Sequence, residues 1–289
     1  MAIESLDALM RAGESRDLFD VIIDSDCIDR GVTREESFEK MRGLFEAIRR
    51  AKEGYDPALR SQSGMVGGEG AKMRRYLKNG KTISGDYAAK VIAQALEMGE
   101  SNACMKCIVA APTAGSCGVL PAALLPYQER ENLDDDAMVR ALYVAGAIGQ
   151  VVAKKASIAG AAGGCQAEIG TASAMAAGAL CYLAGGSAKA VCHAAAIAIK
   201  SLLGLVCDPI AGLVEVPCVK RNAAGALIAM SSADMALAGV FSAVPPDEVI
   251  DAMRDVGDKM DVSLRETGIG GVAGTTFGQM ISEKMSGAK

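Results

Sequence analysis

The sequence predicts an all-α fold, a single mainly helical domain of closely packed helices rich in Ala and Gly. Half of the 289 residues are apolar (51%), yet aromatic residues make up only 4% and Trp is absent. Small side chains therefore supply much of the apolar content and let helix backbones approach closely. Apolar residues also recur at helical spacing. Strand signals are sparse, and only the short apolar runs 108–111 and 213–216 are of undecided type.

Residues 1–60 predict a small N-terminal subregion of short helices with polar faces. Ser5 indicates a helix start, and Thr33 with Glu36 matches a capping box. The stretch 61–85 is rich in Gly and is expected to be irregular. After the capping box, apolar residues recur at helical spacing: Phe38, Met41, Leu44, Phe45 and Ile48.

Residues 86–289 predict a helical core. Pro121 suits the first turn of its helix, whereas Pro126 is expected to kink or end that helix. The run 245–247, Pro-Pro-Asp, is a start signal for the last helix, and the tail 268–278 is rich in Gly and Thr. The predicted helices are 86–97, 119–130, 135–156, 170–184, 188–205, 222–238 and 247–259.

Charge and hydropathy argue against two classes of partner. The net charge is −5, the isoelectric point is about 5.2 and no cluster of Lys and Arg occurs, so nucleic-acid binding is not expected. The apolar run 141–153 is too short to span a bilayer. The run 171–188 is long enough but weakly hydrophobic, because it is rich in Gly and Ala. Both are interpreted as buried helices, and no membrane partner is expected.

The cysteine content indicates the compartment. The first residues, 1–11, lack a basic segment followed by an apolar stretch, so no signal peptide is expected. Nine cysteines are an odd number in such a chain, which makes disulfides improbable and predicts a cytoplasmic location, where thiols stay reduced.

Three cysteines lie in breaks between Ala-rich helical stretches. Cys165 follows two glycines, Cys207 precedes Asp-Pro, and Cys218 follows a proline. Backbone N–H groups exposed at a helix start lower the pKa of a thiol and favour the thiolate that binds metal. Three such ligands can hold an iron–sulfur cluster with one iron open to substrate. Spacing alone does not decide this, since common ferredoxin motifs are much tighter.

The other cysteines have simpler interpretations. Cys181 and Cys192 lie within helices among apolar residues and are interpreted as core residues. Cys104 and Cys107 form a C-x-x-C pair, a spacing that serves metal binding or redox chemistry. No second pair completes a zinc site. This pair keeps open the alternative of a non-catalytic, metal-binding or redox-sensing helical protein.

Three segments resemble one known family. They are 108–118 (IVAAPTAGSCG), 156–170 (ASIAGAAGGCQAEIG) and 207–223 (CDPIAGLVEVPCVKRNA), and the likeness extends to 67–69 and 84–86. The chain resembles the iron–sulfur-dependent L-serine dehydratases, in particular their separate α subunit. A related group, similar to iron–sulfur cysteine desulfidases, shares the helical architecture, but the segment 207–223 is closer to the serine enzymes.

The resemblance implies an activity, a cofactor and a partner. It implies an all-helical lyase that converts L-serine to pyruvate and ammonia, with a role in amino-acid degradation and gluconeogenesis. It also implies a [4Fe–4S] cluster held by Cys165, Cys207 and Cys218. Fused relatives carry a Ser-His-Thr-x-Gly-Pro motif in a second domain. That motif is absent here, so a heterodimer with a β subunit is expected, whose histidine would supply a proton acceptor.

The residues also suggest how serine would be handled. Pyridoxal phosphate is not expected, because Lys154, Lys155 and Lys200 look like solvated helix positions. A metal with an open position would instead stabilise the departing hydroxide. The turn of Thr113, Ala114, Gly115 and Ser116 precedes a predicted helix, where exposed N–H groups suit a carboxylate. By itself the turn is equally an ordinary Gly turn with a Ser cap, and the resemblance favours substrate binding. Asn102 lies upstream and is a further candidate.

The general base is not determined by the sequence. Glu168, three residues past Cys165, is a candidate because it is the only charge between 156 and 188. A lone carboxylate in such a stretch needs a partner. Lys220 is a second candidate, or a cation that binds carboxylate near the cluster. His193 is the only histidine and lies in a helical run, so no catalytic role is expected for it.

Overall fold

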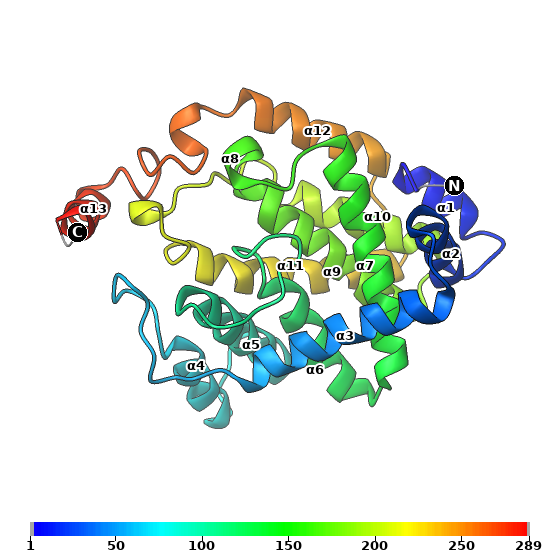
Figure 1. Cartoon of the computed structure of the whole chain (residues 1–289), viewed down its shortest axis with the longest axis horizontal. Helices are drawn as coiled ribbons and strands as arrows, with labels where there is room; N and C mark the ends of the chain where they lie inside the picture. Colours follow the sequence, from blue (N-terminus) through cyan, green and yellow to red (C-terminus); the bar gives the residue numbers. More distant parts are fainter. Residues whose placement is uncertain (1–2, 288–289) are drawn as a thin grey trace.

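The computed structural model describes residues 3–287, and in that range the prediction of an all-α fold is confirmed. It contains thirteen α-helices, and its only β feature is an isolated bridge between Cys207 and Arg265. The first and last described helices lie on opposite sides of the molecule (Figure 1). The division into a subregion of residues 1–60 and a core of residues 86–289 stays a prediction.

The helices of the first third are α1 (Leu6–Ala12), α2 (Leu18–Arg30), α3 (Arg34–Glu53), α4 (Glu69–Lys78) and α5 (Asp86–Ala103). Those that follow are α6 (Val119–Glu131), α7 (Asp135–Lys155), α8 (Gly160–Gly163), α9 (Thr171–Leu183), α10 (Ala188–Lys200), α11 (Cys218–Leu237), α12 (Pro246–Lys259) and α13 (Thr276–Ser286). A π-helical turn (η1, Gln166–Gly170) joins α8 to α9. Two 3₁₀ turns, η2 (Ile210–Gly212) and η3 (Val262–Leu264), complete the described helical elements.

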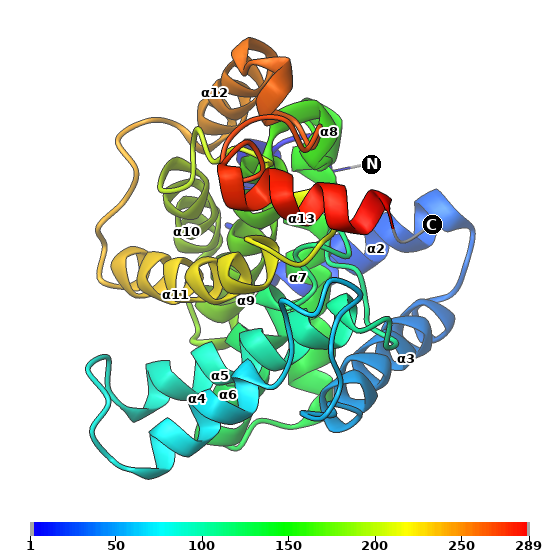
Figure 2. The ribbon, with the colours of Figure 1, turned by 90° about the vertical axis from the view of Figure 1, so that its left-hand side faces the viewer.

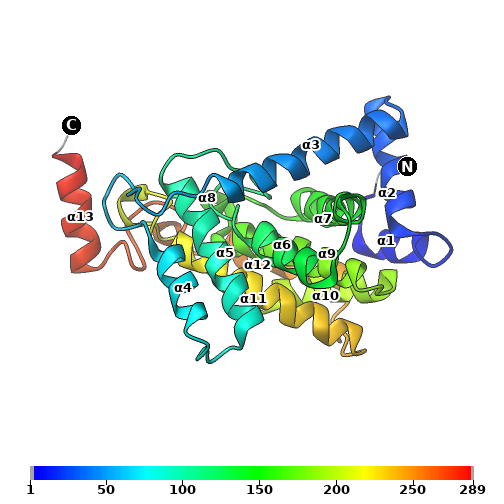
Figure 3. The ribbon, with the colours of Figure 1, turned by 90° about the horizontal axis from the view of Figure 1, so that it is seen from below.

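The predicted start signals near the N-terminus are confirmed. The Ser5 hydroxyl accepts from the Ala8 N–H at 3.0 Å. The capping box of α3 is complete, because the Glu36 N–H donates to the Thr33 hydroxyl at 3.2 Å and the Thr33 N–H donates to the Glu36 carboxylate at 2.9 Å. Such caps satisfy backbone groups that a helix start leaves free, each worth about 1 kcal/mol. Helix α3 then runs along the outside of α7 (Figure 3).

Helix α9 is the central helix of the core. Its residues Thr171–Cys181 are all buried, and α6, α7, α10 and α11 pack around it. Figure 2 shows α12 on one side of this bundle and α4, α5 and α6 on the other. Small residues set the spacing: a Cβ on Gly225 of α11 would lie 2.9 Å from Ile169 and 3.1 Å from Val119. The expected close approach of helix backbones is thus present.

Several element boundaries differ from the predicted ones. Helix α6 ends at Glu131, one residue past its predicted end, so Pro126 does not end it; eight consecutive residues up to that proline are buried, and packing offsets the lost hydrogen bond. Helix α11 begins at Cys218 rather than at residue 222, since the run that follows Pro217 contains no helix breaker. Helix α10 ends at Lys200 and not at 205, ahead of Gly204, which has φ +82°. Neither undecided apolar run forms a strand.

Three of the described helices were not predicted. The expectation that 61–85 is irregular is wrong for α4 (Glu69–Lys78), because residues 71–78 contain no Gly or Pro to break the helix. The short α8 (Gly160–Gly163) was not predicted either. The Gly- and Thr-rich tail ends in α13, which starts where the Thr275 hydroxyl accepts from the Gly278 N–H at 3.1 Å. This helix packs on η2, at the edge of the molecule (Figures 1 and 2).

Helix α7 is the one described helix that is long and apolar enough to cross a membrane by length and composition. Its most apolar window of 18 residues has a mean hydropathy of 1.2, and 67% of that window is buried inside the protein. Core helices of globular proteins meet the same two criteria.

The close packing at Gly225 generates a testable prediction. Gly225→Ala should lower the free energy of unfolding by about 1–3 kcal/mol, because the added methyl group overpacks the contact of α11 with α6 and α9. Gly146→Ala in α7 is the matched control, since nothing lies within 4 Å of its Cβ position. The control should stabilise the protein by up to about 1 kcal/mol through helix propensity. Urea unfolding measures the free energy of unfolding of both variants. Equal changes in the two variants would contradict the packing argument.

Candidate metal and substrate site

The structure brings Cys165, Cys207 and Cys218 to one region from three different helix breaks. Cys165 directly precedes η1, Cys207 lies in the connection after α10, and Cys218 is the first residue of α11. All three are free thiols with relative exposures of 2%, 2% and 6%. Rare π-helical turns such as η1 are frequent at functional sites.

The three thiols interact electrostatically. The hydrogen bond from Cys207 is the largest influence on Cys165 and lowers its pKa, assisted by the Arg221 guanidinium. The same hydrogen bond, together with burial, raises the pKa of Cys207. Burial, with the Cys165 charge second, raises the pKa of Cys218 to about 12. The expectation that helix starts lower the pKa of these thiols is therefore wrong for Cys207, where the hydrogen bond with Cys165 dominates, and for Cys218, where desolvation outweighs the backbone hydrogen bond.

The backbone at Cys207 is held on both sides. Its N–H donates to the Leu264 carbonyl at 2.8 Å, and its carbonyl accepts from the Glu266 N–H at 2.7 Å. Residues 264–266, after α12, therefore fix the backbone position of this cysteine in the connection between α10 and α11. The segment 264–266 is thus part of the site although it lies far from Cys207 in the sequence.

Gly160 has no side chain, which lets the Cys207 sulfur and the Glu168 carboxylate approach its backbone closely. A Cβ at this position would lie 2.7 Å from the Cys207 Sγ and 2.8 Å from the Glu168 Oε2. The same Sγ and Oε2 atoms are 4.0 Å apart. Burial raises the pKa of Glu168, which outweighs the lowering by a hydrogen bond from Thr113. The sequence therefore located the carboxylate correctly beside the cysteines, and its partner is Thr113.

The predicted substrate turn lies against this carboxylate. The hydroxyl oxygens of Thr113 and Ser116 are 3.1 Å apart, and Ser116 is fully buried. A Cβ on Gly115 would lie 3.4 Å from both Glu168 and Val214, which places the turn next to the connection between Cys207 and Cys218. Ala114 is exposed.

Asn222 connects the turn to the helix of Cys218, and the sequence analysis missed it. Its Oδ1 accepts from the Gly118 N–H at 2.8 Å, and its Nδ2 donates to the carbonyls of Gly115 at 2.8 Å and Cys218 at 3.0 Å. It is 1% exposed. The available signal was its position four residues after Cys218, one helical turn along the same face.

Arg221 is the second residue that sequence reasoning missed. Its guanidinium donates to the Val206 carbonyl at 2.8 Å and pairs with Asp208 at 2.9 Å. It therefore binds both sequence neighbours of Cys207. It also donates a hydrogen bond to Cys165. A partly buried cation thus lies beside the Cys165 sulfur, where the sequence analysis had considered its neighbour Lys220.

The other candidates lie outside this cluster of side chains. Lys220 is 64% exposed and forms an ion pair with Glu69 at 2.8 Å, so its ammonium group points toward α4. Asn102 lies near the end of α5, and no described contact joins its side chain to the turn. His193 stacks on Phe241, with ring centroids 4.8 Å apart.

The donor set suits an iron–sulfur cluster by residue type, because cysteine thiolates are the usual ligands of such clusters. Within residues 3–287, no group of three or more His, Cys, Asp or Glu side chains is arranged to hold a single metal ion. Cys165, Cys207 and Cys218 are buried and come from separate elements. The Arg221 guanidinium interacts with Cys165 and Cys218.

Fold and site together define a class: an all-α protein whose reactive side chains gather where its core helices break. The family described as serine dehydratase alpha chain matches residues 5–273, and the chain belongs to this family. It is 49% identical over 255 residues to the probable L-serine dehydratase, alpha chain, of Bacillus subtilis strain 168, covering 88% of this chain and 85% of that one.

Two further relatives show how the chain relates in length to this family. The L-serine dehydratase, alpha chain, of Peptoniphilus asaccharolyticus is 45% identical over 265 residues, which cover 91% of each chain. L-serine dehydratase 1 of Escherichia coli K12 is 38% identical over 252 residues, covering 86% of this chain but 51% of that protein. The chain therefore matches the alpha chains over most of their length and about half of the longer relative.

The Asn222 contacts predict a stability effect. Asn222→Ala leaves the Gly118 N–H and the Gly115 carbonyl without their partner, and each unsatisfied buried group costs about 1–3 kcal/mol. We expect a loss of at least about 2 kcal/mol in the free energy of unfolding, measured by urea unfolding. The control is Ser231→Ala on the same helix, whose exposed hydroxyl bonds to the Ile228 carbonyl. A loss at Asn222 no larger than at Ser231 would contradict the assigned role.

Proposed function

We propose that this chain is the α subunit of an L-serine dehydratase, which converts L-serine to pyruvate and ammonia, and that Cys165, Cys207 and Cys218 hold a [4Fe–4S] cluster. The observation that carries the proposal is the meeting of these three free, buried thiols beside the Thr113–Ser116 turn. The relatives' names support the reaction, because they describe alpha chains of L-serine dehydratases.

The side chains around the thiols support the ligand assignment. Arg221 carries a positive charge next to Cys165 and is anchored through Asp208 and Val206. A fixed cation offsets the negative charge that three thiolates bring into a buried place. Gly160 lets Cys207 and Glu168 pack closely, since a Cβ at this position would lie less than 3.0 Å from both side chains. When bound, such a cluster supplies an iron with an open position, which acts as a Lewis acid toward the β-hydroxyl of serine.

The turn of Thr113, Ala114, Gly115 and Ser116 is proposed to bind and orient the substrate. Its backbone precedes α6, and N–H groups at a helix start favour a carboxylate. Asn222 holds this turn on the helix that begins at Cys218. The distance between the turn and the thiols is therefore fixed. A fixed distance is needed to orient a small substrate.

Glu168 is the residue of this chain that is best placed to accept the α proton of serine. Its carboxylate lies between the Thr113 hydroxyl and the Cys207 sulfur. Loss of this proton and of the β-hydroxyl gives 2-aminoacrylate, which tautomerises and hydrolyses to pyruvate and ammonia. Lys220 is less suited, because its ammonium group is paired with Glu69.

The proposal assigns no role to pyridoxal phosphate. Lys155, one of the lysines that the sequence singled out, pairs with Asp247 at 3.3 Å. We further propose a separate β subunit as the partner, in keeping with the alpha-chain names of the relatives. A cytoplasmic location suits nine free cysteines, because reducing conditions preserve them.

The ligand assignment predicts a shared loss of cluster and activity. After anaerobic reconstitution with iron and sulfide, Cys165→Ser, Cys207→Ser and Cys218→Ser should each lose the broad visible absorbance, the bound iron and the formation of pyruvate from L-serine. The control Cys181→Ser changes another buried thiol, in α9, and should retain all three.

Two outcomes would contradict the assignment. One is loss of iron only in Cys181→Ser. The other is zinc bound to Cys104 and Cys107 in place of iron, without lyase activity. Release of sulfide from L-cysteine faster than pyruvate from L-serine would favour the desulfidase alternative. The assays are run with and without the β subunit, which should be needed for full turnover.

The position of Glu168 predicts a catalytic effect. Glu168→Gln should keep its iron and lower kcat by about 100-fold or more, as expected for loss of a general base. Lys220→Gln is compared because the two residues were rival candidates. A lower kcat in Lys220→Gln alone would reverse the assignment. An unchanged kcat in both variants would locate the base on the partner subunit.

A further inference from the structure

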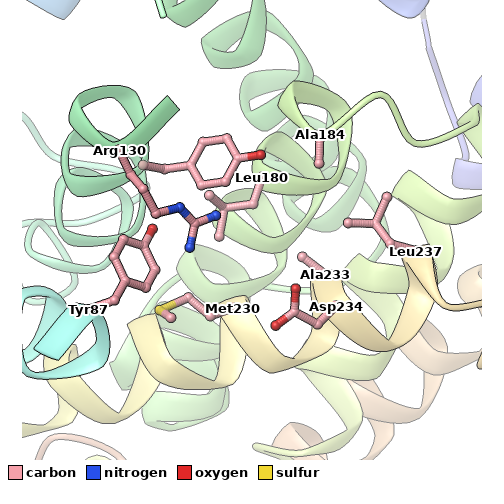
Figure 4. Close-up of a pocket in the computed structure, with 9 residues that line it drawn as sticks. Tyr87, Arg130, Leu180, Ala184, Met230, Ala233, Asp234 and Leu237 are labelled. Atoms are coloured by element: carbon pink, nitrogen blue, oxygen red, sulfur yellow. The ribbon is translucent and has the colours of Figure 1, made fainter. Parts of the chain in front are cut away.

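A small pocket lies between α5, α6, α9 and α11, away from the cysteine site (Figure 4). Asp234, on its rim, comes sixteen positions after Cys218 on α11, which corresponds to about 24 Å along the helix axis at 1.5 Å per residue. The volume of the pocket is about 140 Å³. Its lining residues are Tyr87, Tyr127, Arg130, Leu180, Ala184, Met230, Ala233, Asp234 and Leu237.

Arg130 presents a positive charge that two aromatic rings hold in place. Its guanidinium carbon lies 4.2 Å from the ring centroid of Tyr87 and 4.9 Å from that of Tyr127. These cation–π contacts restrict the side chain without using its N–H groups. The described hydrogen bonds join Nε to Glu131 at 2.6 Å and the guanidinium to the Tyr127 hydroxyl. A guanidinium has five N–H groups, so donors remain for a ligand.

Tyr87 contributes a hydroxyl that lacks a partner. The oxygen is buried and has no hydrogen bond within the described residues. Leaving such a group unpaired costs about 1–3 kcal/mol. Burial raises the pKa of Tyr87 to about 12, so the hydroxyl stays protonated at neutral pH and is able to donate. An acceptor that enters the pocket beside Arg130 would satisfy it.

Asp234 brings a negative charge to the same space from the opposite wall. Figure 4 shows its carboxylate on α11, facing the pocket across from the Arg130 guanidinium. The two groups form no ion pair, since the described pair of Arg130 is with Glu131. The remaining wall, around Leu180, Met230 and Leu237, is apolar. The pocket thus has a cationic end, an anionic end and an apolar side.

We propose that this pocket is a second binding site, for a small zwitterionic amino acid. Its carboxylate would accept from Arg130 and Tyr87, its ammonium group would donate to Asp234, and a short side chain would face Met230. A simple anion is disfavoured by the carboxylates of Glu131 and Asp234, and a simple cation by Arg130. The volume is below the roughly 300–1,000 Å³ of sites for larger ligands, which limits the ligand to few heavy atoms.

The experiment follows the methyl signal of Met230 in the full-length protein labelled with ¹³C-methyl methionine, assigned with Met230→Leu. Glycine, L-alanine and L-serine are titrated, and acetate and methylamine serve as fragments with a single charge. We expect a saturable shift with the zwitterions only. Arg130→Gln and Asp234→Asn should each weaken binding by at least about tenfold, because each removes a charged hydrogen-bond partner.

Arg254→Gln and Asp255→Asn on α12 are the matched controls, since both side chains are exposed and away from the pocket. They should bind like the unchanged protein. The variant Ser116→Ala separates this site from the proposed substrate site, and the Met230 shift should persist in it. The proposal is overturned if no zwitterion shifts Met230, if acetate acts as well as glycine, or if only Ser116→Ala abolishes the shift. The binding readout is independent of iron and of lyase activity.

Discussion

The whole site depends on close packing of small-residue helices, which forces the breaks between them to one region. Helix α11 lies close to α6 and α9 because Gly225 has no side chain to separate them. A helix of this kind cannot shift along its neighbours without overpacking its contacts. Cys218, at its first residue, is therefore fixed relative to Cys165, which precedes the turn into α9.

Arg221 and Asn222, which follow Cys218 on α11, connect the segments of the site to one another. Arg221 reaches across to both neighbours of Cys207, and Asn222 holds the turn that contains Ser116. The partly buried guanidinium of Arg221 and the buried amide of Asn222 are costly unless their hydrogen bonds are made. The hydrogen bonds of these two side chains therefore favour one arrangement of the Ser116 turn, the segment around Cys207 and the start of α11, which are distant in sequence.

Much of the fold was predictable because helix formation is local. The capping box at Thr33 and the core helices follow from spacing and end signals that lie within a few residues of one another. Helices α4 and α13 were not predicted, because the sequence before each is rich in Gly, which by itself favours irregular backbone. Packing of the first two turns of α6 against the core allows that helix to continue past Pro126.

The sequence by itself determined the helical fold, the three cysteines at helix breaks and the carboxylate of Glu168, because each is a feature of residue type and local order. Only the tertiary structure decided that Arg221 lies beside the Cys165 sulfur while Lys220 pairs with Glu69. Neighbouring residues on a helix differ by about 100° in direction, so what each one meets depends on which elements pack there. The same holds for Arg130 and Asp234, which come from different helices and meet only in the folded chain.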